Sequence, residues 1–145
     1  MTIGIDKYIT NSDETMSDTM TTQTTYPARA LLKRPDKPPE IISISFPFVM
    51  SSDNSDLIKE IAPVIDADKV DHVDYSSTIV IFYASDRSRP YNFNISYQSF
   101  FGNVLFLKCK RHHSLLTGTM PVSLSNIEIR RICAAMGWKR PEERE

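Results

Sequence analysis

The chain has 145 residues, of which 41% are hydrophobic, and a formal net charge of −1, a composition that predicts one globular domain. Its two cysteines cannot build a disulfide framework, so we expect a reducing intracellular compartment, cytoplasmic or nuclear. Apolar runs fall short of the roughly 18 residues of a membrane span, and the N-terminus lacks the basic-then-apolar order of a signal peptide, so we expect no membrane association.

Residues 1–40 are predicted to form a disordered arm. The stretch 10–25 is rich in Thr, Ser and Asp and has no apolar period, so it cannot offset the entropy lost on ordering. The following stretch, 26–40, contains four prolines and resembles an extended linker. Within it, a basic-x-Leu-apolar pattern is a candidate docking peptide, formed by Arg29, Leu31 and Leu32.

A single α+β domain is predicted over residues 41–138, and its first elements are a strand and a helix. Residues 41–48 alternate apolar with polar side chains, which indicates a strand with one buried face and, because of Pro47, a place at the sheet edge. Apolar residues then recur at three- and four-residue spacing from Leu57, which predicts a helix that Pro63 bends or ends near Ala62.

Three further strands carry most of the apolar pattern. Residues 73–84 are almost continuously apolar and β-branched, which predicts one central strand. Residues 91–98 alternate without a break and are expected to pair with 104–111 around a three-residue loop, Phe101-Gly102-Asn103. This register makes the row from Tyr91 to Tyr97 part of the core, buries Cys109 and leaves Phe106 exposed.

The last predicted element is a helix that begins after Ser125. Ser125 and Glu128 form the pattern of a capping box, and Gly137 supplies a left-handed stop. Trp138 is expected to fold back as a hydrophobic cover, and residues 139–145 form a charged tail. The resulting fold class is an antiparallel sheet of about four strands, in the order β-α-β-β-β-α, with both helices on one face behind the arm.

Charge is divided unevenly along the domain. Lys and Arg number 2 against 7 Asp and Glu in residues 51–80, but 10 against 5 in residues 81–145. A basic surface on the outer face of the last hairpin and on the last helix could contact a nucleic acid or another polyanion. The candidate residues for this surface are Asn92, Asn94, Lys108, Lys110, Arg111, His113, Arg130 and Arg131.

The same surface gives an analogy but no base-reading motif. The α-β-β-β-α portion has the element order of a double-stranded-RNA-binding domain, yet the lysine-rich start of the last helix is replaced by "LSNIEIRR". The chain also lacks the Lys/Arg-Gly-aromatic signature of an RNA-recognition strand. Nucleic-acid binding is therefore an alternative and not the leading hypothesis.

Signals for chemistry are weak. Cys109, His112, His113 and Cys133 do not have the paired spacing of a zinc site, so we expect no metal and no cofactor. His72 lies between Asp71 and Asp74, but ordinary surface charge explains it as well as an acid–base role does. We predict a protein that is not an enzyme.

The leading hypothesis is a protein–protein interaction module, or a small subunit of a complex, with a regulatory or tethering arm. Its candidate partner surface comprises Phe46 and Phe48 at the edge strand and Trp138 after the last helix. Nucleic-acid binding is the alternative. A virus- or phage-encoded accessory protein that acts on a host factor is a third hypothesis.

Overall fold

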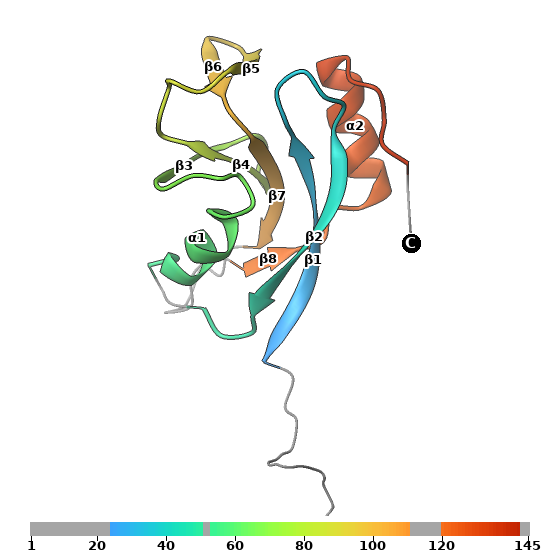
Figure 1. Cartoon of the computed structure of the whole chain (residues 1–145). Helices are drawn as coiled ribbons and strands as arrows, with labels where there is room; N and C mark the ends of the chain where they lie inside the picture. Colours follow the sequence, from blue (N-terminus) through green and yellow to red (C-terminus); the bar gives the residue numbers. More distant parts are fainter. Residues whose placement is uncertain (1–23, 51–52, 111–119, 143–145) are drawn as a thin grey trace, which may run out of the picture.

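The computed structural model describes residues 24–50, 53–110 and 120–142. Its centre is a six-stranded antiparallel sheet (Figure 1). Neighbouring strands follow in the order β2 (Glu40–Pro47), β1 (Thr25–Lys33), β7 (Val104–Lys110), β4 (Ile79–Ala84) and β3 (Val70–Asp74). The sixth strand, β8 (Met120–Val122), pairs with the second half of β7. Strands β5 (Tyr91–Ile95) and β6 (Gln98–Phe101) form a separate hairpin, and the helices are α1 (Ser55–Ile61) and α2 (Asn126–Met136).

The sheet is covered on both faces, and each face has its own core. Alternate side chains of β1, β4 and β7 pack toward α1 or toward α2, which is why these strands are almost continuously apolar. We call the first cluster the α1-face core; it includes Ala28, Leu32, Val80, Phe82, Leu105, Leu107, Leu57 and Ile61. The second, the α2-face core, includes Leu31, Ile81, Phe106, Ile129, Ile132, Cys133, Phe93 and Phe100.

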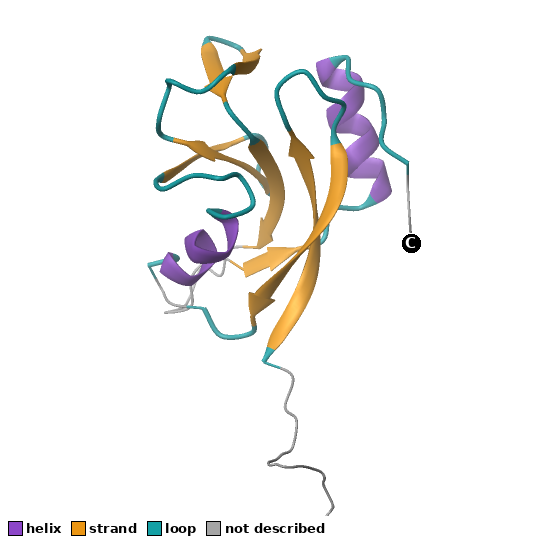
Figure 2. Cartoon of the chain, in the orientation of Figure 1, coloured by secondary structure: helices purple, strands orange, loops and turns teal. Residues whose placement is uncertain are grey.

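The α+β class is confirmed, but two details of the predicted architecture are wrong. Figure 2 shows the helices on opposite sides of the strands, not on one face. The described residues also form eight strands where about four were expected. The described elements follow the order β-β-α-β-β-β-β-β-β-α. The predicted order β-α-β-β-β-α, and the analogy to a double-stranded-RNA-binding domain that depends on it, therefore do not hold.

The largest correction concerns the predicted arm. Residues 25–33 are strand β1, which lies between β2 and β7 inside the sheet. Its backbone also bonds the segment between β8 and α2, since Arg29 N–H donates to Ser123 Oγ at 2.9 Å and Leu124 N–H donates to the Arg29 carbonyl at 3.0 Å. The domain thus begins before residue 41, and residues 1–23 of the predicted arm lie outside the described residues.

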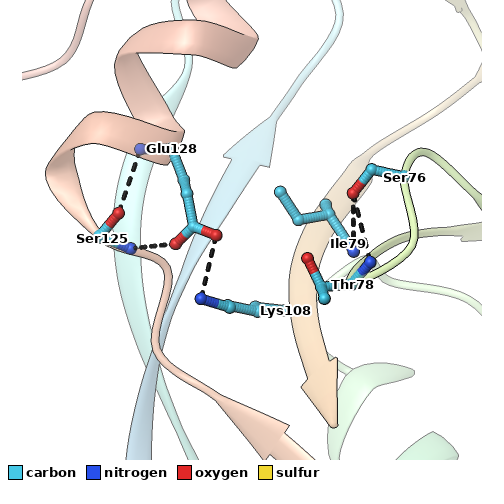
Figure 3. Close-up of polar contacts among 6 residues, drawn as sticks. All are labelled: Ser76, Thr78, Ile79, Lys108, Ser125 and Glu128. Carbon is cyan, nitrogen blue, oxygen red and sulfur yellow. Dashed lines mark hydrogen bonds and ion pairs between the residues drawn. The ribbon is translucent and has the colours of Figure 1, made fainter. Parts of the chain in front are cut away.

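The predicted strand over residues 73–84 is in fact a hairpin. Strands β3 and β4 pair antiparallel around a turn at residues 75–78. The Ser76 hydroxyl oxygen accepts the N–H groups of Thr78 and Ile79, at 3.3 and 3.1 Å (Figure 3), and so fixes the turn locally. This turn leaves β3 as one margin of the sheet.

The predicted strand over residues 91–98 is also a hairpin. Ile95 pairs with Gln98 across a two-residue turn, in which Ser96 has a φ of 55°. β7 pairs with β4 and β1 instead of with this segment. As a result Tyr97, predicted to be buried, is fully exposed at 103%, whereas Phe106, predicted to be exposed, is 0% exposed.

Several local predictions are confirmed. α1 ends at Ile61, with Ala62 as its C-cap before Pro63. Gly137 ends α2 with a φ of 72°, in the left-handed region that glycine adopts freely. Trp138 folds back onto Phe93, with ring centroids 5.0 Å apart. Cys109 is buried as expected.

The start of α2 has the predicted capping box, extended by an ion pair (Figure 3). Ser125 Oγ accepts the Glu128 N–H at 3.1 Å, and Glu128 Oε1 accepts the Ser125 N–H at 2.9 Å. Lys108 Nζ lies 3.0 Å from Glu128 Oε2. Burial alone would raise the pKa of Glu128, but the bonds from Ser125 and Lys108 outweigh it, so the pKa lies below its usual value.

Glu128→Gln is expected to remove the charge while keeping the capping geometry, because Gln also serves in a capping box. A carboxyl with a lowered pKa stabilises the fold above its unfolded pKa, and this stabilisation is lost as pH falls through the folded pKa. We expect the variant to be less stable than the parent at pH 7 by about 1 kcal/mol or less, with the two free energies of unfolding converging in acid. Urea titrations between pH 7 and pH 3 measure the difference. Ser125→Ala is the control, because it removes a cap hydroxyl at every pH and its deficit persists in acid.

Candidate functional site

Both margins of the sheet are open in the part of the chain that the structure describes. β2 pairs with β1 alone, and β3 pairs with β4 alone. In an antiparallel pair, successive residues direct their N–H and C=O alternately toward the neighbouring strand and away from it. Each margin therefore presents a row of peptide groups that an added strand could bond.

The register of β3 identifies which groups face outward. Ser85 N–H donates to the Lys69 carbonyl at 3.0 Å, and Tyr75 N–H donates to the Ile79 carbonyl at 2.8 Å. These bonds place the odd-numbered residues of β3 against β4. The N–H and C=O of Val70 and His72 consequently point away from the sheet. We call this margin, Val70–Asp74, the β3 edge.

A cavity lies on the α1 side of the β3 edge. Its volume is about 240 Å³, and the residues around it that matter for recognition are Leu57, Ile58, Val70, His72, Phe82 and Cys109. The His72 ring lies over this cavity, 6.0 Å from the ring of Phe82. Six of the ten lining residues are apolar, and four of these belong to the α1-face core. Asp53, Asn54, Asp71 and His72 form the polar part of the wall, so the cavity can take an apolar side chain beside polar groups.

A second hollow lies on the other side of the same edge, between β3 and the β5–β6 hairpin. This hairpin groove has a volume of about 530 Å³ and is lined by Val73, Tyr75, Ile81, Ile95, Tyr97 and Phe100. Gln98 is fixed at its border by a hydrogen bond of 3.1 Å to the Tyr83 hydroxyl. The exposed ring of Tyr97 stands at the turn beside the groove, where it can cover a side chain that enters.

The β3 edge is acidic. Residues 66–74 include four aspartates, Asp66, Asp68, Asp71 and Asp74, against the single cation of Lys69. All four carboxylates belong to residues that are exposed. Asp71 is held beside the strand by the Ser85 hydroxyl, which donates to its Oδ2 at 2.9 Å. An added segment would therefore meet negative charge along the edge, with a hollow of mixed apolar and polar lining on each face.

The predicted polyanion surface is not one surface in the described residues. Asn92 is structural: its side-chain N–H groups donate to the carbonyls of Lys33 and Gly102, both at 2.8 Å, and its oxygen accepts from Lys33 Nζ at 3.1 Å. Asn94 bonds Ser99 within the hairpin at 3.0 Å. These two residues belong to β5, which does not pair with the strand that carries Lys108 and Lys110.

The basic members of that predicted surface are also separated. Lys108 is paired with Glu128, whereas Lys110 is exposed at the end of β7. Arg130 and Arg131 are exposed on α2. Arg111 and His113 lie outside the described residues. The outer hairpin face on which the prediction depended does not exist, because β7 is an interior strand covered on both sides.

Lys33 is the one charged residue that is buried in the described part of the chain. It is 7% exposed, and its Nζ donates to the Arg34 carbonyl at 2.7 Å and lies 5.4 Å from the centre of the Trp138 ring. Burial lowers the pKa of Lys33, and the nearby Asp36 carboxylate partly opposes this shift. Its contacts join β1, β5 and the residue after α2, so we assign it to the fold.

The predicted partner and docking residues have mixed positions. Phe46 is 0% exposed and cannot contact a partner, whereas Phe48 is 48% exposed beside Tyr26, with ring centroids 5.1 Å apart. Trp138 is half-buried against the α2-face core. Of the docking peptide, Arg29 is partly buried, and Leu31 and Leu32 are 0% and 2% exposed inside the sheet, so this segment cannot dock while the domain is folded.

The two cysteines lie in different cores, Cys109 in the α1-face core and Cys133 in the α2-face core. Within the described ranges, no three His, Cys, Asp or Glu side chains gather closely enough to hold a metal ion. No helix of this described part is long and apolar enough to cross a membrane. Comparisons with protein-family models, curated proteins and solved structures gave no match to the chain.

Proposed function

We propose that the protein is a non-enzymatic protein–protein interaction module that takes an extended segment of a partner as an added strand at the β3 edge. The observation that carries this proposal is the presence of a hollow on each face of one open edge. In strand addition, main-chain hydrogen bonds give affinity, and pockets for alternate side chains give specificity. The outward peptide groups of Val70 and His72 supply the first requirement, and the two hollows supply the second.

The chemistry of the edge defines the partner segment. Successive side chains of an added strand point to opposite faces, so one apolar residue would enter the α1-side cavity and its neighbour would enter the hairpin groove. Residues beyond these two would lie along the carboxylates of Asp68, Asp71 and Asp74. We therefore expect a basic segment with neighbouring apolar residues, without proline at the bonding positions. A tethering role for residues 1–23 belongs to the same proposal.

His72→Pro is expected to weaken this binding at least about tenfold without unfolding the domain. Its N–H points away from β4, so proline removes an outward donor and no bond within the sheet. Because the variant loses a central main-chain hydrogen bond and the proline ring obstructs the added strand, its affinity for the partner segment should be at least about tenfold weaker. Peptides selected from a display library against the parent protein, then measured by titration calorimetry against both proteins, give the comparison.

The matched control is Ser43→Pro, which makes the same change at an outward position on the opposite margin, β2. It should leave peptide affinity unchanged, and circular dichroism should show that both variants are folded. Selected peptides should be enriched in Lys and Arg, and their binding should shift the amide resonances of residues 70–74. Peptides that bind both variants equally well would exclude the β3 edge. Salt-sensitive RNA or DNA binding that is lost in Lys110→Glu, a change at an exposed residue, would instead favour the nucleic-acid alternative.

A further inference from the structure

The opposite margin of the sheet, β2, has a register that can be deduced from one bond. Phe48 N–H donates to the Thr24 carbonyl at 3.2 Å, and the pairing of β1 with β2 then continues without a bulge to residue 40. By alternation, even-numbered residues of β2 bond β1, and the N–H and C=O of Ile41, Ser43 and Ser45 point outward. No residue in the described ranges pairs with this side of β2.

Prolines bracket this outward row. Pro47 occupies the outward position after Ser45, and Pro39, a buried residue, directly precedes the strand; neither has an N–H to donate. The donors therefore form a short row that is symmetric about Ser43. An identical strand running antiparallel places residue 41 opposite residue 45 when the two-fold axis passes through Ser43.

Other registers are poorer. An axis through Ile44 would place Pro47 opposite Ile41, and an axis through Ile42 would place Pro39 opposite Ser45, so each loses donors at both ends. With the axis at Ser43, the two prolines fall opposite each other beyond the bonded row. The spacing of donors on β2 is thus complementary to itself in one register.

Charge distinguishes β2 from β3 as a surface for self-pairing. Natural sheets protect open edges with charged side chains, and the β3 edge carries Asp71 and Asp74. β2 carries no charged side chain from Ile41 to Pro47, although most natural edges avoid such a stretch. A two-fold contact brings like residues together, so an uncharged strand meets no repulsion there.

We propose that β2 pairs antiparallel with β2 of a second copy of this chain, about a two-fold axis at Ser43. The contact joins two six-stranded sheets into one continuous sheet. Ile42 of each copy lies opposite Ile44 of the other on the α1 side, which covers the half-exposed Ile42 side chain. Ser43 lies opposite Ser43 on the other face. The β3 edges remain open at the two ends, so the dimer presents two peptide-binding margins.

Charge reversal at Ser43 tests both the partner and the register. The Ser43 side chain is exposed and its N–H points outward, so Ser43→Glu and Ser43→Lys are expected to fold as the parent does. Each variant alone places like charges face to face on the axis and should dimerise about five- to tenfold more weakly. An equimolar mixture should recover association as a heterodimer, because opposite charges then meet. Sedimentation velocity over a concentration series gives the dissociation constants.

Two further variants serve as controls for this test. Ser43→Pro removes the central pair of bonds and should be monomeric where the parent is dimeric, and His72→Pro should dimerise as the parent does. A parent protein that sediments as a monomer at every concentration overturns the proposal. So does a mixture of the Glu and Lys variants that associates no better than either alone, since Ser43 would then not face Ser43. Neither result affects peptide binding at β3.

Discussion

Phe106→Ala is expected to lower the free energy of unfolding by about 3–5 kcal/mol. The ring is fully buried in the α2-face core, where it packs against Phe93, Tyr75 and Trp138, with centroids 6.1, 5.5 and 5.9 Å away. Truncation leaves a cavity enclosed by elements that cannot all move inward together, so the loss includes a cavity cost beyond the transfer of the ring from water. Urea denaturation followed by circular dichroism measures the change.

Tyr97→Ala is the matched control for that truncation. Tyr97 is also a large aromatic residue, but its side chain is fully exposed at the hairpin turn. Its removal should change stability by less than about 0.5 kcal/mol. The alternating sequence pattern predicts the opposite result for these two variants, because it predicts a buried Tyr97 and an exposed Phe106. Equal losses in the two variants would contradict the placement of β7 inside the sheet.

Deletion of residues 1–40 is expected to abolish folding. It removes β1, and with it Leu31 from one core and Leu32, Ala28 and Ala30 from the other. It also separates β2 from β7 by an empty strand position. Each fully buried leucine stabilises the fold by roughly 2 kcal/mol, so with the lost hydrogen bonds included the sum is comparable to the whole stability of an ordinary domain.

Deletion of residues 1–23 is the control for this truncation, because every contact described above lies within residues 24–142. Dispersed amide resonances are expected for the shorter deletion and collapsed ones for the longer. A folded, monomeric protein that begins at Ile41 would show that the sheet closes without β1. The two deletions together locate the start of the domain.

Local signals allowed parts of the fold to be predicted. Caps and stops act within one helical turn, so Ser125 with Glu128, Gly137 and Pro63 could be interpreted without knowledge of the rest of the molecule. Buried faces of helices follow the same rule, because the apolar residues Ile129, Ile132 and Cys133 have helical spacing and lie together in the core. These features depend on neighbours in sequence.

The hairpins could not be predicted in the same way. In residues 91–98 the alternation continues through the turn, and Ser96 takes a positive φ where Gly, Asn or Asp is the usual signal. β1 was not predicted because it contains Pro27 and lies between a polar stretch and three further prolines at 35, 38 and 39. Its residues Ala28, Ala30, Leu31 and Leu32 nevertheless have the apolar pattern of a strand buried on both faces.

The candidate site was missed for a different reason. Residues 70–74 are short, charged and ordinary as a sequence, and they become a site only because β3 is the last strand of the sheet and lies between α1 and the β5–β6 hairpin. Strand order is set by pairings between segments far apart in the chain, which no local pattern specifies. The one available signal was the cluster of aspartates beside a histidine.

The pairing of β1 with β7 has a consequence for the way the chain reaches this structure. Leu31 lies beside Phe106, and Arg29 bonds Ser123 and Leu124, so strand β1 is completed by residues that are synthesised much later than β1 itself. Closing such long loops costs entropy before contacts repay it, and non-local pairing slows folding. During synthesis, both margins of the β1–β2 hairpin would stay unpaired until β7 emerged from the ribosome. We therefore expect the protein to be prone to aggregation while it is synthesised, when these strand margins are exposed.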